Sequence, residues 1–225
     1  MCGIVVVFRR GVGDPKPEIE RALHLIAHRG PDDSGIWTGK GNGVGGPFTL
    51  GLGNVRLSIL DLSPEGHQPM VGSEGFVITF NGEIYNYREI REELKTLGHA
   101  FRTSCDTEVI LAAYRQWGPA CVERFIGMFA FIIVDLHRGR LFAARDRFGI
   151  KPLYYWFSPE GFVAFASEIK QFTVLPGWNP KINGQRVYEY LTWGLTDHSE
   201  ETMFRDVSQL RGGECMGLSL EGGSP

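Results

Sequence analysis

The sequence predicts a layered α+β domain, in which antiparallel sheets are covered by helices on separate faces. From residue 129 onward, short apolar runs are separated by turn residues, as is typical of antiparallel strands. These runs are Phe129–Asp135, Arg140–Ala144, Leu153–Phe157 and Phe162–Ala166. The helical patterns are fewer and do not alternate with the strands one for one, so a parallel sheet of strand–helix–strand units is disfavoured.

The N-terminal part begins with a predicted buried strand at Gly3–Phe8, a run rich in β-branched residues. Pro17–Ala27 has helical periodicity, and Pro17 is tolerated in a first turn. Asp33–Pro47 is rich in glycine and is predicted to be loop or turn. Phe48–Leu60 then predicts short strands interrupted by glycines.

The middle of the chain predicts one strand followed by two helices. Phe76–Phe80 is an apolar strand that we expect to end at Asn81-Gly82, a dipeptide that prefers turns. Tyr87–Leu97 and Thr107–Trp117 have amphipathic patterns, and Asp106 stands where an N-cap is expected.

The last part of the chain changes in character. A short helix is predicted around Ser167–Thr173 and another at Val187–Trp193. Leu210–Pro225 is polar and glycine-rich, which is typical of a domain edge. We therefore expect one domain over residues 1–190 and a domain edge and linker over residues 191–225.

Composition excludes several classes of protein. The 225 residues are 43% hydrophobic and 22% charged, so the chain can form one globular core. Acidic residues outnumber basic ones by 26 to 23, which argues against nucleic-acid binding. The longest apolar run, Met128–Val134, is far shorter than the roughly 20 residues that cross a membrane. Four cysteines and six histidines show no metal-ligand spacing, so we expect a soluble cytoplasmic protein without a metal site.

Cys2 is the first candidate for chemistry, because removal of Met1 would put a thiol and a free α-amine on one residue. An N-terminal amine can activate a weak side-chain nucleophile on its own residue. Position alone favours the alternative, a small buried residue that opens a core strand.

Four further residues have both a structural and a functional interpretation. Asn81 and the Gly82 N–H fit an oxyanion hole or a hairpin turn. Arg56, in a half-buried strand, needs an anion, which is either a protein carboxylate or the carboxylate of a ligand. Asp106 fits a helix cap or, together with Glu83, a site for an ammonium group. Taken together with Cys2, the set fits a small zwitterion with an amide to cleave, which describes glutamine.

The chain also resembles the glutaminase domain of class II (N-terminal nucleophile) glutamine amidotransferases, and among them the glutamine-hydrolysing asparagine synthetase branch. Relatives of the purine and sugar-phosphate pathways carry a different arginine segment where this chain has Asn54–Ser58. The resemblance covers roughly residues 1–175 and rests on Met1–Val5, His28–Gly35, Arg56–Asp61, His67–Met70, Phe80–Asn86, Ser104–Ile110, Gly127–Ala130, Arg145–Tyr154 and Phe165–Lys170.

The resemblance implies a four-layer αββα sandwich of two antiparallel sheets, of the N-terminal nucleophile hydrolase type. It implies that Cys2, freed of Met1, attacks glutamine and forms a γ-glutamyl thioester, with its own amine as base. Asn81 and Gly82 would form the oxyanion hole, and Arg56 would bind the α-carboxylate. The remaining implied contacts are Glu83 and Asp106 with the α-amino group, and a pocket wall at Leu57, Ser58, Ile59 and Leu60.

The resemblance also implies a partner. Full enzymes of this branch continue into a domain that uses ATP and magnesium to convert aspartate to asparagine with the released ammonia, and no phosphate-binding motif of that domain occurs in these 225 residues. The glutaminase domain itself is expected to need no cofactor. We expect an excised domain, or a short protein that works with a partner, and a homodimer is one open arrangement. Arg145–Tyr155 is the segment we expect to contact the ammonia-accepting domain, a solvated hairpin end being the alternative.

Overall fold

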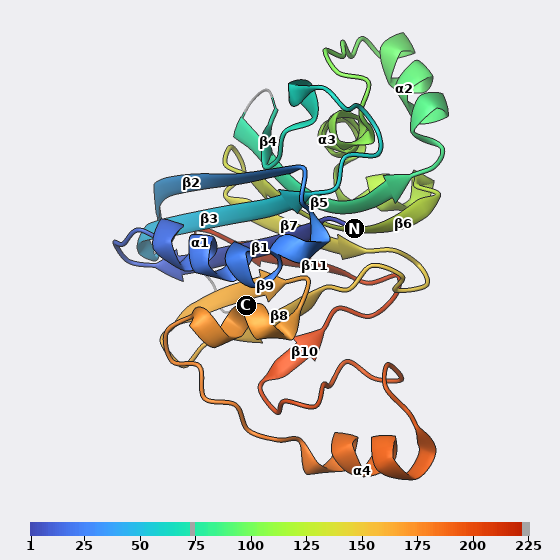
Figure 1. Cartoon of the computed structure of the whole chain (residues 1–225). Helices are drawn as coiled ribbons and strands as arrows, with labels where there is room; N and C mark the ends of the chain where they lie inside the picture. The colour runs from blue at the N-terminus through green and yellow to red at the C-terminus, as the bar shows by residue number, and fades with distance from the viewer. Residues whose placement is uncertain (73–74, 222–225) are drawn as a thin grey trace.

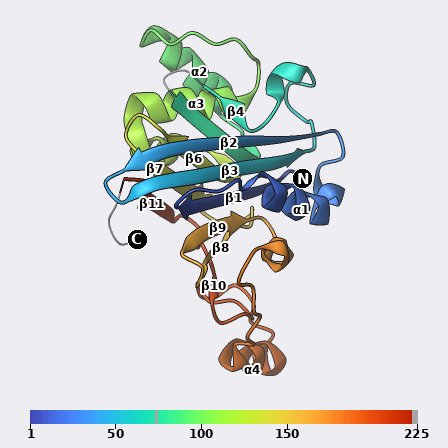
Figure 2. The same ribbon diagram turned by 90° about the vertical axis from the view of Figure 1, so that its left-hand side faces the viewer.

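The chain folds into two antiparallel sheets that pack face to face, as seen in a computed structural model that describes residues 1–72 and 75–221 (Figures 1 and 2). The larger sheet has the order β10-β8-β9-β1-β3-β2. Its strands are β1 (Gly3–Arg10), β2 (Asp33–Gly43), β3 (Gly46–Arg56), β8 (Tyr154–Phe157), β9 (Phe162–Ala166) and β10 (Val207–Gln209). The smaller sheet has the order β11-β7-β6-β5-β4. Its strands are β4 (Met70–Val71), β5 (Phe76–Ile84), β6 (Gly127–Asp135), β7 (Arg140–Arg145) and β11 (Cys215–Ser219).

Helices cover the outer faces of both sheets, which confirms the four-layer αββα sandwich. On the larger sheet lies α1 (Lys16–Leu25), and on the smaller sheet lie α2 (Tyr87–Thr96) and α3 (Asp106–Trp117) (Figure 1). A fourth helix, α4 (Gly184–Trp193), projects away from the sandwich. The single-turn and irregular helices are η1 (Ala27–Arg29), η2 (Pro64–Gly66), η4 (Gly118–Arg124) and η5 (Ile169–Val174). In the part of the chain that the structure describes, no helix is long and apolar enough to span a membrane.

The alternation of side chains along β1 explains why this strand lies at the centre of the larger sheet. Ile4, Val6 and Phe8 belong to the core between the two sheets, whereas Val5 and Val7 pack on the opposite face against α1. Both faces of the strand are therefore buried, which is why its sequence is continuously apolar.

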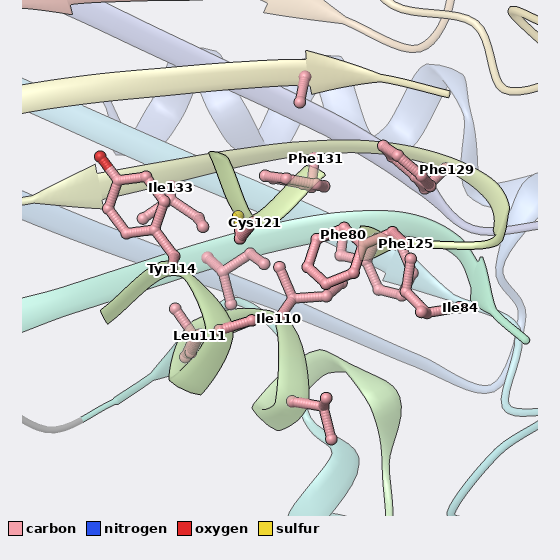
Figure 3. Close-up of a cluster of buried hydrophobic side chains, with 14 of the residues drawn as sticks. Phe80, Ile84, Ile110, Leu111, Tyr114, Cys121, Phe125, Phe129, Phe131 and Ile133 are labelled. Atoms are coloured by element: carbon pink, nitrogen blue, oxygen red, sulfur yellow. The ribbon is translucent and has the colours of Figure 1, made fainter. Parts of the chain in front are cut away.

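A second core lies between the smaller sheet and its helices (Figure 3). Aromatic rings of Phe125, Phe129 and Phe131 meet edge-on or tilted, with ring centroids 5.6–6.3 Å apart. Ile110 and Tyr114 of α3 close this cluster from the helix side. The packing fixes α3, and with it the residue at which α3 begins, against β5 and β6.

The prediction of a loop over Asp33–Pro47 was wrong, because these residues form the long β2–β3 hairpin. The glycines make room for rings rather than for turns. A Cβ on Gly39 would lie 2.3 Å from the Trp37 ring, and one on Gly41 would lie 2.3 Å from the Phe48 ring.

The predicted turn at Asn81-Gly82 was also wrong, since β5 continues through both residues to Ile84. Gly82 pairs with Phe129 of β6 in the antiparallel ladder. A Cβ at Gly82 would lie 2.2 Å from the carbonyl oxygen of Met128, so this close strand contact requires glycine.

The end of the chain differs from the linker that we predicted from residue 191 onward. β10 pairs with β8, and β11 pairs with β7, so both strands are part of the sheets. Leu210, Leu218 and Leu220 are buried in the core between the sheets. These strands are three and five residues long, and Gly217 interrupts the apolar pattern of the second, so their periodicity was too short to detect. The predicted glycine-rich tail at residues 222–225 lies outside the described residues.

Candidate active site

A pocket of about 120 Å³ lies where β1 begins and where β3 and β5 end. It brings together nine of the ten residues predicted from the sequence: Cys2, Arg56, Leu57, Ile59, Leu60, Asn81, Gly82, Glu83 and Asp106. The tenth, Ser58, is not among the lining residues of this pocket. Its N–H donates to the Asp32 carboxylate at 2.7 Å, in an adjoining hollow.

Contacts with Arg29 and Leu57 fix the position of Cys2 in this pocket. Its carbonyl oxygen accepts a hydrogen bond from Arg29 Nε at 2.9 Å, and its Sγ lies 3.6 Å from the carbonyl oxygen of Leu57. Burial is the main cause that raises the pKa of the Cys2 thiol, while the chain's amino terminus and Arg56 act in the opposite direction. The thiol is therefore protonated near neutral pH and needs a base before it can attack.

Arg29 is a positioning residue that the sequence analysis missed as an individual side chain. Besides the Cys2 carbonyl, its guanidinium contacts Glu168 through Nη1 at 3.0 Å. Glu168 is in turn paired with Lys170 at 2.9 Å. Both Arg29 and Glu168 lie in segments that carry the family resemblance, and this was the available signal.

Arg56 pairs with backbone carbonyls, and of the two anions that the sequence allowed, the protein carboxylate is not found among the described residues. Its side chain is buried, and its guanidinium donates to the carbonyl oxygens of Leu60, Asp61 and Ser63, with distances of 3.1 Å to Leu60 and 3.4 Å to Ser63. Among the described residues no carboxylate forms an ion pair with it. Its positive charge is thus solvated by neutral dipoles and remains available to an anionic ligand.

The loop that supplies these carbonyls has an unusual backbone. Asp61 is in the left-handed region with φ 55°, which turns consecutive carbonyls toward the guanidinium. Hydrogen bonds from Ser63 and Ser104 anchor the Asp61 carboxylate and lower its pKa to about 2. Gly66 packs against the guanidinium of Arg56, and a Cβ there would lie 2.1 Å from Arg56 Nη2, so this position has no room for a side chain.

Asn81 is buried, and both polar atoms of its side-chain amide have no hydrogen-bond partner within the structure. A buried polar group in this state costs roughly 1–3 kcal/mol unless a ligand satisfies it. Its amide and the backbone of Gly82 line the pocket together with Cys2. An oxyanion formed at the thiol would find these donors in place.

A buried polar network behind Asn81 holds β5 in position and was not predicted. Asn54 Nδ2 donates to Gln68 Oε1, Thr79 Oγ1 and the Phe80 carbonyl at 3.1–3.2 Å. Gln68 Oε1 also accepts from the Phe80 N–H at 2.7 Å. The network links β3 of one sheet to β5 of the other immediately before Asn81.

Asp106 is the first residue of α3, and the N-cap is Cys105, so the predicted capping role was wrong. One carboxylate oxygen of Asp106 instead accepts the Ile84 N–H at 2.9 Å. Burial, with a smaller effect from the nearby Glu83 carboxylate, raises the pKa of Asp106 to about 6. Two carboxylates that repel each other in a buried pocket favour a cation between them.

The described residues contain no group of three or more side chains placed to hold a metal ion. The ionisable groups of the pocket are instead the two thiols Cys2 and Cys105, the carboxylates Glu83 and Asp106, and the cations Arg56 and Lys151.

Comparison with known proteins agrees with this geometry. The profile of the glutamine amidotransferase domain family matches residues 1–224. The chain belongs to this family. Glutamine-hydrolysing asparagine synthetase 3 of Bacillus subtilis is 33% identical over 227 residues, which is 99% of this chain and 35% of that protein. Amidase chry2 of Gibberella zeae is 38% identical over 216 residues, which is 91% of this chain and 29% of that protein.

Solved structures support the amidotransferase fold. Glutamine phosphoribosylpyrophosphate amidotransferase from Bacillus subtilis superposes with a TM-score of 0.62 at 19% identity, covering 80% of this chain and 45% of that chain. At this identity the match supports the fold alone. The chain spans about a third of the length of the two curated relatives above.

Proposed function

We propose that this domain hydrolyses L-glutamine to glutamate and ammonia through a γ-glutamyl thioester on Cys2. The observation that carries the proposal is the buried amide of Asn81. It has no hydrogen-bond partner among the described residues and lines the same pocket as Cys2, the residue after the initiator methionine. Such an amide is costly in a resting protein and useful only when a ligand oxygen arrives.

The substrate would be held at its amino-acid end by groups of opposite charge. Arg56 would bind the α-carboxylate, since its guanidinium has no carboxylate partner in the described protein. Glu83 and Asp106 would bind the α-ammonium, whose positive charge relieves the repulsion between them. The side-chain amide would then reach toward Cys2 and Asn81.

In the first half-reaction, the α-amine of Cys2 takes the thiol proton while Sγ attacks the amide carbon. The carbonyl oxygen becomes negative and accepts hydrogen bonds from Asn81 and the Gly82 N–H. When the carbon–nitrogen bond breaks, the protonated amine returns its proton to the leaving nitrogen, and ammonia departs. Water then adds to the thioester carbon, the same amine accepts its proton and returns it to sulfur, and glutamate leaves. Retained Met1 would turn the Cys2 nitrogen into an amide without basicity, so the proposal requires its removal.

The ammonia would serve an acceptor domain that converts aspartate to asparagine with ATP and magnesium, either in the same polypeptide or in a partner. The asparagine synthetase relative favours this acceptor. A second candidate keeps the glutaminase and changes the carboxylate that is amidated, and it is favoured by the relative named as an amidase. No cofactor is proposed for the glutaminase domain itself.

The acceptor would contact the tip of the 145–155 segment. The ends of this segment include buried residues, whereas Phe148 and Ile150 near its middle are 85% and 54% exposed. Both residues lie in the same loop as Lys151, which lines the pocket. A domain docked on this loop would therefore lie beside the site where ammonia is released.

The test is steady-state release of glutamate and ammonia by the purified protein, with the mass of the chain measured to verify loss of Met1. Cys2→Ala should abolish turnover, because no other group can form the thioester. Cys105→Ser is the matched control, since Cys105 lines the same pocket and is expected to be dispensable. Undiminished turnover in Cys2→Ala would overturn the proposal.

A further inference from the structure

One lysine of the 145–155 segment lines the pocket and has no role in the proposed chemistry. Lys151 is only 5% exposed, yet it lies among the residues around Cys2 and Asn81. It belongs to the loop between β7 and β8, far in sequence from the residues that the mechanism uses. A buried lysine is uncommon, and an unpaired buried ammonium is costly.

The backbone of Lys151 is tightly anchored next to the oxyanion site. Its N–H donates to Asp146 Oδ2 at 3.0 Å, and the same oxygen accepts the Phe129 N–H at 3.1 Å. Phe129 pairs directly with Gly82 across the sheet. In addition, Arg145 Nε donates to the Lys151 carbonyl at 2.7 Å. The loop that carries Lys151 is therefore linked through Asp146 to the strand pair β5–β6, to which Asn81 and Gly82 belong.

The ammonium of Lys151 has no ion pair or hydrogen bond to any residue that the structure describes. The other buried cations behave differently. Arg56 and Arg145 both donate to several carbonyl oxygens, and Arg186 pairs with Glu189. Lys151 is thus a largely buried lysine of the pocket lining whose ammonium is not bonded to a described residue and is not completely shielded from solvent, so it is available to a charge that arises in the pocket.

The charged side chains of the pocket are Arg56, Lys151, Glu83 and Asp106, and their formal charges cancel. A bound glutamine is itself neutral, with its carboxylate on Arg56 and its ammonium between the two acids. The acids then retain one negative charge in excess of the ammonium, which the positive charge of Lys151 offsets, so the pocket has no net charge before the reaction. The negative charge that appears during the reaction lies first on sulfur and then on the amide oxygen.

We propose that Lys151 stabilises this developing negative charge on Cys2 Sγ and on the oxyanion during thioester formation. The inference rests on the proposed glutaminase function. Lys151 keeps its three protons throughout: the sulfur–carbon bond forms, the carbonyl π electrons move to oxygen, and the α-amine carries the proton from the thiol to the leaving nitrogen. The ammonium thereby offsets the penalty that burial imposes on the Cys2 thiolate.

The test compares Lys151→Met, which keeps the length of the side chain without its charge, with Lys151→Arg, which keeps the charge. Lys40→Met is the matched control, because Lys40 is exposed on β2. Two readouts are needed: kcat and KM for glutamine, and the pH dependence of Cys2 alkylation by iodoacetamide, with the adduct located by peptide mass spectrometry. The second readout involves no glutamine and reports the thiol alone.

We expect Lys151→Met to lower kcat by roughly 10–100-fold, somewhat less than the loss of a direct oxyanion donor. Its alkylation midpoint should rise by about one pH unit, since a nearby opposite charge favours the thiolate. Lys151→Arg and Lys40→Met should retain a midpoint close to that of the parent protein. The groups that face Cys2 and remain in all variants are its amine, Arg56, Glu83, Cys105 and Asp106.

An unchanged kcat and an unchanged alkylation midpoint in Lys151→Met would overturn the proposal, even if KM changed. Should that variant fail to fold, Lys151→Gln carries the same comparison with a polar, uncharged side chain. If the parent protein alkylates at Cys2 but does not hydrolyse glutamine, the glutaminase proposal fails, and the alkylation midpoints still decide whether Lys151 acts on the thiol.

Discussion

The pocket and the buried polar network around it, here called the frame and represented by Arg145 and Asn54, contain the same types of buried residue with different hydrogen-bond partners. In the frame, Arg145 donates through Nε and both Nη atoms to the carbonyl oxygens of Gly149, Lys151 and Leu210 at 2.6–2.7 Å and to Gln209 Oε1 at 3.0 Å. In the pocket, Arg56 also donates to three carbonyl oxygens, those of Leu60, Asp61 and Ser63, but through its Nη atoms only.

The asparagines differ more clearly. The two N–H groups of Asn54 Nδ2 face three acceptors at 3.1–3.2 Å, whereas neither polar atom of Asn81 has a partner among the described residues. Both side chains are almost completely buried, and Asn54 Oδ1 is also without a partner. The two residues therefore differ at the donor end of the amide, which Asn54 uses within the protein and Asn81 does not.

The asparagine pair gives the largest expected effect. Asn81→Ala should lower kcat for glutamine by roughly 10²–10³, the usual loss for an oxyanion donor. Its stability to urea should stay the same or increase, because an unsatisfied buried amide is removed. Asn54→Ala should do the reverse, losing about 1–3 kcal/mol of stability by releasing Gln68, Thr79 and Phe80. Equal losses of stability in both variants would contradict the comparison.

The arginine pair tests the same contrast for charge. Arg56→Lys should raise KM for glutamine by about 10–100-fold, because a point charge replaces a planar fork that can bind a carboxylate through two hydrogen bonds. Arg145→Lys should instead cost about 2–4 kcal/mol of unfolding free energy, since several buried carbonyls lose their donors. Glutamine titrations and urea melts of both variants provide the check. A larger KM effect at Arg145 than at Arg56 would reverse the assignment.

Asp106 gives a smaller effect that depends on pH. Its pKa of about 6 in the free protein predicts that kcat/KM falls about tenfold for each pH unit below 6, because the protonated acid cannot pair with an ammonium. Asp106→Asn should remove this dependence while lowering kcat/KM at neutral pH. A pH–rate profile with the same acid limb in both proteins would exclude Asp106 as its source.

The same group affects stability in the opposite direction. The folded pKa lies above the unfolded value of 3.8, so the folded state binds the proton more tightly than the unfolded state. The stability contributed by Asp106 is complete below pH 3.8 and is lost as the pH rises through 6. Asp106→Asn should therefore unfold at higher urea concentration than the parent protein at pH 8, and the two should converge as the pH falls through 6 toward 3.8.

The sequence predicted the layers of the fold and most of the pocket, for reasons that particular residues make clear. The strand at Gly3–Phe8 was evident because both of its faces are buried and its residues are β-branched. The β2–β3 hairpin was missed because Gly39 and Gly41 serve aromatic packing, which local propensity cannot express. At Gly82, the dipeptide preference for a turn was overridden by a close contact between strands.

Residues that act through distant partners could not be predicted from the sequence. Arg29 supports Cys2 across 27 positions, and Glu168 completes that contact from 139 positions further along. The hydrogen-bond state of Asn81 depends on what β6 and α3 place around it, and no local pattern encodes it. The sequence allowed two alternative roles for Asp106. The structure excludes the N-cap position, because α3 has Cys105 there, and shows the Asp106 carboxylate bonded to Ile84 N–H.

The most direct test of the account is the intact mass of the purified protein after treatment with a thiol-alkylating glutamine analogue. The account predicts a chain that lacks Met1 and carries a single adduct, located on Cys2 and prevented by excess glutamine. A chain that lacks Met1 and gains no adduct on Cys2, or one that is labelled equally well in the presence of glutamine, would contradict it.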